Sequence, residues 1–349
     1  DGALILAQQV YKHITGDFGG VKLPAYYSDN MVIQRDEPIR IAGTADASER
    51  VEVSLGGKKG KAYASAQGEW EVTLPQMPAG GPYKLTVRTK NRTIEYNNVW
   101  MGDVWVCSGQ SNMEWRLKNC TTGKEDCSAA AHQPLLHLYN MRGITDTYDN
   151  EWSVEVCEKV NRLEYFHPTK WELSTPQSAG DFSAIAYHFG KTLADSLNVH
   201  VGLVLNAVGG STTESWIDRW TLEFEYPQVL YNWTEGDFGQ DWARGRAKRN
   251  IAASKVPLQR HPFMPHYLFD AGMLPLKDMN PKGVIWYQGE SNAHNVELHE
   301  ALFTLLEKSW RKYFNEPELP FYFVQLSSIA PRQTWPHFRD SQRQLTEKL

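Results

Sequence analysis

Three short segments of this 349-residue sequence place glycine near serine, each directly after an apolar run, and two of them also contain amide residues. They are residues 108–113 (SGQSNM), 208–211 (VGGS) and 288–292 (QGESN). A serine hydroxyl can act as a nucleophile, and an amide side chain can donate a hydrogen bond to a developing negative charge. A glycine turn lets a backbone N–H come close to a substrate oxygen. Together these residue types are the parts of a site for acyl transfer.

One such turn by itself is typical of a helix cap, because serine and asparagine are common N-cap residues. Three of them after three strands of one sheet favour a shared site instead. A phosphate site is not indicated, since the sequence has neither a Gly-x-x-x-x-Gly-Lys-Ser/Thr nor a Gly-x-Gly-x-x-Gly motif.

The elements that must position these segments alternate between strands and helices after residue 99. Nearly continuous apolar runs predict buried strands, as expected where both faces of a sheet are covered. Apolar residues at helical spacing predict helices over 183–197, 296–314 and 336–348. This alternation predicts a doubly wound parallel sheet with its site beyond the carboxyl ends of the strands. The expected strands are 104–107, 135–139, 201–206, 284–287 and 321–326.

Residues 21–99 have a different pattern of short alternating runs separated by turn residues, which predicts a small antiparallel β-sandwich. The expected strands there are 39–41, 51–55, 70–74, 84–87 and 93–96. Residues 1–20 are expected to form an N-terminal helical segment, with an amphipathic helix over 4–14. The predicted division is therefore 1–20, an accessory β-domain over 21–99 and an α/β domain over 100–349.

Composition excludes several classes of protein. The net charge is −5 and no Lys/Arg block is long, so we expect no nucleic-acid partner. No run of 18 apolar residues occurs, so we expect no membrane span. The 13 Trp and 16 Tyr indicate either an aromatic-rich core or a surface that stacks on sugar rings. Cys120 and Cys127 flank a polar loop that a disulfide would close, and Cys107 is expected to be a buried apolar residue.

Four segments carry a resemblance to the sialate O-acetylesterases of the SGNH hydrolase superfamily. They are residues 102–113 (GDVWVCSGQSNM), 207–216 (AVGGSTTESW), 283–293 (GVIWYQGESNA) and 23–34 (LPAYYSDNMVIQ). The resemblance covers roughly residues 21–349. It implies a flavodoxin-like three-layer α/β/α domain preceded by the β-domain.

The resemblance also implies roles for individual residues. Ser111 matches the nucleophile, and its own N–H and that of Gly209 match backbone donors of the oxyanion hole, with Gly210 as the alternative to Gly209. Gln288 matches a side-chain donor. No metal or organic cofactor is implied. Trp115 and Trp216 flank the segments and are candidates for substrate binding, with burial in the core as the alternative.

A serine esterase also needs a histidine base oriented by an acid. The family's Asp-x-x-His block is expected after residues 340–342 and a further strand, and it does not occur before Leu349. We expect the catalytic His and Asp to come from a C-terminal segment or a second chain outside this numbering. The alternative is an internal histidine: His294, His266 or His337.

The sequence therefore predicts an extracytoplasmic (periplasmic, secreted or lysosomal) carbohydrate O-acetylesterase that acts on 9-O-acetyl sialic acid or a related sugar. Arg219 and Arg332 are candidates for binding a sialate carboxylate. One alternative is an esterase of acetylated xylan or other hemicellulose. A second is a carbohydrate-binding protein without catalytic activity, and a third is an esterase for longer acyl chains.

Overall fold

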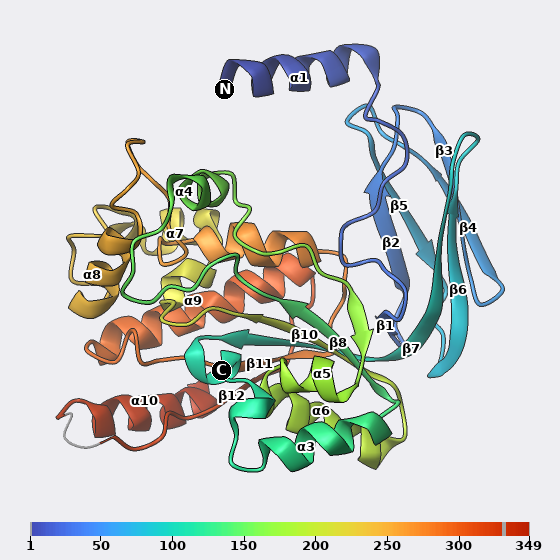
Figure 1. Ribbon diagram of the computed structural model, residues 1–349. Helices are drawn as coiled ribbons and strands as arrows, with labels where there is room; N and C mark the ends of the chain where they lie inside the picture. Colours follow the sequence, from blue (N-terminus) through green and yellow to red (C-terminus); the bar gives the residue numbers. More distant parts are fainter. Residues whose placement is uncertain (1, 330–332, 349) are drawn as a thin grey trace.

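The computed structural model describes residues 2–329 and 333–348 and contains a parallel sheet at its centre (Figure 1). Each neighbouring pair of its five central strands is parallel. A short sixth strand, β9, pairs antiparallel with β8 at the edge. In spatial order the strands are β12 (Phe321–Phe323), β11 (Gly283–Tyr287), β7 (Thr93–Gly109), β10 (Val201–Ala207), β8 (Leu136–Met141) and β9 (Trp171–Leu173).

Helices cover both faces of this sheet, which confirms the predicted α/β fold. Alternate residues of β7 contact opposite layers: Cys107 belongs to the apolar cluster that includes residues of α6, and Val106 to the cluster that includes residues of α9. Figure 1 shows α3, α5 and α6 on one side of the sheet and α7 and α9 on the other. Their bounds are α3 (Gly123–Ala129), α5 (Pro176–Gly180), α6 (Ala184–Leu197), α7 (Arg219–Glu225) and α9 (Val296–Phe314).

The N-terminal part of the chain contains two small sheets that share apolar side chains. One is formed by β4 (Lys58–Tyr63), β3 (Arg50–Leu55), β6 (Gly80–Arg88) and the first half of β7, and the other by β2 (Ile39–Thr44) and β5 (Glu69–Leu74). Side chains alternate between buried and exposed along β3 and β5, so each strand has one core face. The sequence did not predict β4, because its residues (KKGKAY) are too polar for an alternating apolar pattern.

Strand β7 joins the two parts of the molecule. Residues 93–101 pair antiparallel with β6, whereas residues 103–109 lie between β10 and β11 in the parallel sheet. A further short strand, β1 (Val32–Gln34), pairs parallel with residues 100–102 of β7. The predicted division at residue 100 thus falls inside one continuous strand, and one apolar cluster includes residues from both sides of it. The division into domains stays a prediction.

Helix α1 (Gly2–Thr15) is drawn at the top of Figure 1, apart from the sheets. It confirms the expected N-terminal helix, and its Leu4, Leu6, Val10, Tyr11 and Ile14 side chains are all exposed. No helix among residues 2–329 and 333–348 is long and apolar enough to cross a membrane. The remaining elements are α2 (Ser111–Glu114), η1 (Leu117–Asn119), η2 (Ala130–His132), α4 (Val154–Asn161), η3 (Thr213–Trp216), η4 (Pro227–Leu230), α8 (Asp241–Asn250), η5 (Phe269–Met273), η6 (Leu274–Leu276) and α10 (Trp335–Lys348).

One expectation is corrected. The predicted buried strand over 321–326 is a three-residue strand, β12, whose side chains are half-buried or exposed. The reason is its position: β12 pairs with β11 alone. All four cysteines are free, so the loop between Cys120 and Cys127 is not closed by a disulfide. Cys107 is fully buried as expected, and burial raises the pKa of its thiol.

Candidate active site

The three glycine-containing segments begin at one level along the edge of the sheet. Gly109, the last residue of β7, is the register partner of Ala207 at the end of β10 and of Tyr287 at the end of β11. Because the three strands are parallel neighbours, the loops that follow them are adjacent. This is the arrangement expected at the carboxyl ends of a doubly wound sheet.

The turn after β7 requires a glycine. Gly109 has φ +138°, and a Cβ atom on it would lie 2.1 Å from the carbonyl oxygen of Tyr287. This close approach lets the N–H of Gln110 donate to that same carbonyl at 3.0 Å. The first and third segments are thereby joined directly before Ser111.

The buried side chain of Gln110 strengthens this connection. Its Oε1 accepts hydrogen bonds from the N–H of Gly289 at 3.2 Å and from the N–H of Ser291 at 3.3 Å. Next to Ser111, Asn112 Nδ2 donates to Glu290 Oε1 at 2.6 Å. Gln110 and Asn112 therefore fix the third segment against the turn that carries the predicted nucleophile.

The second segment is fixed by its own set of bonds. The N–H of Val208 and the hydroxyl of Ser211 both donate to the carbonyl of Gly109, at 3.1 and 3.3 Å. The hydroxyl of Ser291 donates to the carbonyl of Gly210 at 3.0 Å. All three segments consequently form one hydrogen-bonded unit around the end of β7.

Ser111 is the first residue of α2 and is exposed to solvent. Gly209 lies next to it, because a Cβ atom on Gly209 would be 3.8 Å from Ser111 Cβ. Among the described residues, none forms a hydrogen bond with the Ser111 hydroxyl. Helix α2 has only four residues, so few aligned peptide dipoles contribute at its start, and the prediction of an oxyanion donor there rests on the single N–H of Ser111.

The N–H of Gly209 is already engaged in this structure. It donates to Glu114 Oε2 at 2.9 Å, while the carbonyl of Gly209 accepts from the Thr147 hydroxyl at 2.5 Å. Glu114 is an exposed residue, but its carboxylate lies against the Gly209 backbone, and this desolvation raises the pKa of the carboxyl. The hydrogen bond from Gly209 and the charge of Arg116 act in the opposite direction.

Gln288 lies beneath the loops with no exposed surface. Its Nε2 donates to the carbonyl of Ser211 at 3.2 Å and to Asn292 Oδ1 at 2.7 Å, and its Oε1 accepts from Thr213 Oγ1 at 2.8 Å. Both amide hydrogens are thus committed within the protein. Gln288 remains a predicted oxyanion donor, and acting as one requires it to exchange one of these acceptors for a substrate oxygen.

The two predicted aromatic residues differ in exposure. Trp115 is 52% exposed and follows α2 directly, so its side chain is accessible to solvent. Trp216 is 0% exposed, donates from Nε1 to Ser211 Oγ at 3.0 Å and packs edge-to-face on Trp286. The expectation that Trp216 lines the pocket is corrected, since its ring supports the second segment from the core.

The internal histidine candidates lie in different environments. His294 is exposed, and its Nε2 is 2.8 Å from the carbonyl of Asp237. His266 is buried and pairs through Nδ1 with Asp270 Oδ2 at 2.7 Å. His337 is exposed on α10.

The two arginines proposed for a sialate carboxylate receive little support. Arg219 forms an ion pair with Glu223 at 2.6 Å, and Arg332 lies outside the described residues. Within the described part of the chain, no group of three or more His, Cys, Asp or Glu residues is arranged to hold a metal ion.

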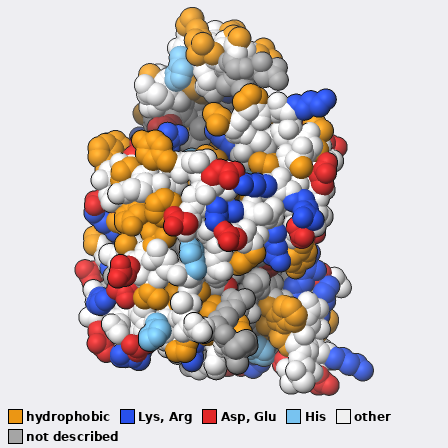
Figure 2. Space-filling model, turned by 90° about the vertical axis from the view of Figure 1, so that its left-hand side faces the viewer, with side chains coloured by type: hydrophobic (Ala, Val, Ile, Leu, Met, Phe, Trp, Pro, Cys, Tyr) orange, Lys and Arg blue, Asp and Glu red, His pale blue; other side chains and the backbone are white. Residues whose placement is uncertain are grey.

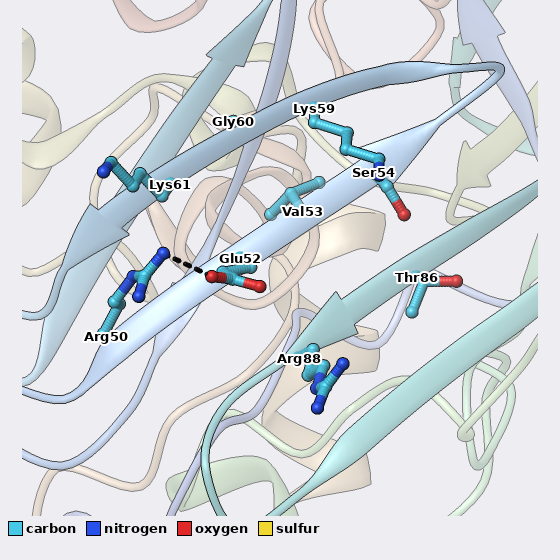
Figure 3. Close-up of a pocket in the computed structure, with 9 residues that line it drawn as sticks. All are labelled: Arg50, Glu52, Val53, Ser54, Lys59, Gly60, Lys61, Thr86 and Arg88. Atoms are coloured by element: carbon cyan, nitrogen blue, oxygen red, sulfur yellow. Dashed lines mark ion pairs between the residues drawn. The ribbon is translucent and has the colours of Figure 1, made fainter.

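A hollow of about 470 Å³ lies elsewhere, on the sheet of β3, β4 and β6 (Figure 3). Lys59 and Lys61 project from β4, Arg88 projects from β6, and Arg50 pairs with Glu52. Because β4 is an edge strand, its lysines are explained by the need to prevent pairing with another chain.

The face of the molecule drawn in Figure 2 shows side chains of both charges interspersed with hydrophobic ones.

Comparison with known proteins gives the context of this site. The profile of the family described as "carbohydrate esterase, sialic acid-specific acetylesterase" matches residues 270–349. The chain is 30% identical to sialate O-acetylesterase of Mus musculus over 339 residues, covering 88% of this chain and 60% of that protein. The human sialate O-acetylesterase is 28% identical over 340 residues, with 90% and 59% covered. The resemblance to the sialate O-acetylesterases is confirmed.

A solved structure supports the same relationship. A carbohydrate acetylesterase from Xanthomonas citri matches with a TM-score of 0.72 and 28% identity, covering 94% of this chain and 66% of that one. The chain spans about 60% of the length of the curated sialate O-acetylesterases that it matches. Its fold is that of a carbohydrate esterase, and its own activity is the subject of the following proposal.

The sequence analysis missed Glu114. The only signal was its place three residues after Ser111, which puts the two side chains on one face of a helical turn. That spacing does not reveal that the carboxylate reaches the loop after β10, because the contact joins residues 95 positions apart.

Proposed function

We propose that this protein is a carbohydrate O-acetylesterase in which Ser111 is the nucleophile. The observation that carries the proposal is the position of Ser111. It lies exposed on a turn that is hydrogen-bonded to both neighbouring loops, beside the glycine turn after β10. Similarity to proteins named sialate O-acetylesterase and carbohydrate acetylesterase supports the same reaction.

The reaction proceeds in two halves. Ser111 Oγ attacks the carbonyl carbon of the acetyl ester while a base takes the hydroxyl proton. The bond from that carbon to the sugar oxygen breaks, the proton passes to the sugar oxygen, and acetyl-Ser111 remains. Water then attacks the acetyl group with the help of the same base, releasing acetate and restoring the Ser111 hydroxyl.

The negative oxygen formed in each half is held by preorganised donors. The N–H of Ser111 and an N–H of the Gly209–Gly210 turn are the proposed backbone donors. Gln288 joins them by exchanging its bond to the Ser211 carbonyl for one to the substrate oxygen. Trp115 offers the exposed ring on which a sugar stacks.

The base is proposed to be a histidine from a further polypeptide segment, in the same chain or in a second one. One observation supports this. The Ser111 hydroxyl has no hydrogen-bond partner among the described residues, so neither His294, bonded to the Asp237 carbonyl, nor His266, paired with Asp270, is joined to it. The proposed substrate is 9-O-acetyl sialic acid or a related acetylated sugar such as acetylated xylan, and the proposed location is extracytoplasmic.

Mutation of Ser111 tests the proposal. The complete protein should release acetate from p-nitrophenyl acetate and from 9-O-acetyl sialic acid, and a fluorophosphonate should label Ser111 covalently. Ser111→Ala should lose both, whereas Ser128→Ala, at an exposed serine of α3, should lose neither. Wild-type turnover by Ser111→Ala would refute the assignment, and a protein that binds acetylated sugars without labelling would be a carbohydrate-binding protein instead.

A further inference from the structure

The Glu114 carboxylate accepts a hydrogen bond from one of the proposed oxyanion donors, the N–H of Gly209. Glu114 Oε2 accepts the hydrogen bond of the Gly209 N–H at 2.9 Å, and a Cβ atom on Gly209 would lie 3.0 Å from Oε2 and 3.8 Å from Ser111 Cβ. Glu114 Oε2 and the Ser111 side chain therefore approach Gly209 from the same side. The carboxylate therefore holds the hydrogen that an acyl oxygen bound to the Gly209 N–H would need.

Two anionic oxygens cannot share this N–H during the reaction. As the acyl oxygen becomes negative, it competes with Glu114 for the same hydrogen and repels its charge. Gly209 can therefore act as a donor only after the carboxylate has moved away. Breaking the charge-assisted hydrogen bond between Glu114 and Gly209 costs free energy. New contacts of the displaced carboxylate must offset this cost.

The two arginines near Glu114 already form ion pairs with another carboxylate. Arg116 and Arg142 lie near Glu114, but both form ion pairs with Asp181, at 3.7 and 3.5 Å. Asp146 contributes a further negative charge to the surroundings of Glu114. The hydrogen-bond donors open to the displaced carboxylate are therefore neutral ones, which are water and hydroxyl groups of the substrate.

We propose that Glu114 selects for the sugar part of the substrate. In the free protein its carboxylate accepts the hydrogen bond of the Gly209 N–H. When substrate binds, the carboxylate instead accepts hydrogen bonds from hydroxyl groups of the acetylated sugar. Exposed Trp115 is the next residue in the chain and is the proposed ring on which the sugar stacks. A simple ester such as p-nitrophenyl acetate has no hydroxyl group, so only water can bind the carboxylate that it displaces. The inference rests on the proposed esterase activity.

The test compares Glu114→Ala and Glu114→Gln with the wild type, using the complete protein and two substrates. Removing the competitor should raise kcat/KM for p-nitrophenyl acetate about tenfold or more, the order expected for one hydrogen bond to a charged group. It should lower kcat/KM for 9-O-acetyl sialic acid. The preference for the sugar ester should fall by at least tenfold in Glu114→Ala, with Glu114→Gln between it and the wild type. Glu125→Ala, at an exposed residue of α3, should change neither substrate.

Two results would overturn the inference. If both substrates lose activity by the same factor in Glu114→Ala and recover in Glu114→Gln, Glu114 only positions the Gly209 loop. If neither variant changes the ratio, the carboxylate does not contribute to selection. Fluorophosphonate labelling separates these outcomes from failure of the proposed function, since Ser111 would still be labelled when only the role of Glu114 is wrong.

Discussion

Replacing Gln110 with alanine should destabilise the site and the fold together. Gln110 is 2% exposed, and its Oε1 is the acceptor for the N–H groups of Gly289 and Ser291. Each buried N–H that loses its partner costs about 1–3 kcal/mol. For two such groups we expect a decrease of about 2–6 kcal/mol in the free energy of unfolding, reduced towards the lower value if water enters the space.

Urea unfolding followed by tryptophan fluorescence measures this decrease. Gln110→Met keeps most of the side-chain length without the acceptor, so it separates the lost hydrogen bonds from the lost volume. Gln67→Ala, at an exposed residue of a turn, is the matched control and should change stability by less than about 0.5 kcal/mol. If Gln110→Met and Gln110→Ala were both as stable as this control, the claim that Gln110 fixes the third loop would be refuted. Acetylesterase activity should fall with stability in both variants, because Ser111 follows directly on Gln110.

Two further predictions concern the backbone at the end of β7 and the response to acid. Gly109→Ala should reduce soluble expression and abolish activity, because its Cβ atom would lie 2.1 Å from the Tyr287 carbonyl at a φ of +138°; a variant with wild-type melting temperature and turnover would contradict this. Burial lowers the pKa of His261 to about 3 from its usual value near 6.5, so the unfolded chain binds the proton first and stability should fall as the pH decreases from about 6.5 towards 3. The contribution to the free energy of unfolding reaches about 1.4 kcal/mol per pH unit. The free energy of unfolding should therefore depend less steeply on pH in His261→Gln than in the wild type. Equal slopes would show that His261 does not titrate in this way.

Local patterns predicted many elements correctly. Helix α9 has the predicted bounds, because its apolar residues recur at helical spacing over five turns. The five predicted runs of the β-domain all lie in observed strands. Strands β1, β4 and β9 escaped prediction because none shows a sustained apolar alternation: β1 and β9 are three residues long, and β4 is mostly Lys, Gly and Tyr.

The candidate site was predicted in its residue types and its place but not in its contacts. Segments 108–113, 208–211 and 288–292 do meet, as the strand-end rule requires. The burial of Trp216 and the commitment of the Gln288 amide were not predictable, because both depend on neighbours from other elements. An aromatic or amide residue beside a site has the same sequence signal whether its side chain faces the pocket or the core.

The sequence by itself determined the α/β alternation and the three glycine-containing turns, and its resemblance to the sialate O-acetylesterases implied Ser111 as the candidate nucleophile. Only the tertiary structure decided that β7 continues from the small sheet into the parallel sheet, and that Glu114 reaches the N–H of Gly209. The physical reason is the range of the interactions. Periodicity and turn chemistry act between residues close in sequence, whereas strand pairing and side-chain hydrogen bonds join residues that only folding brings together.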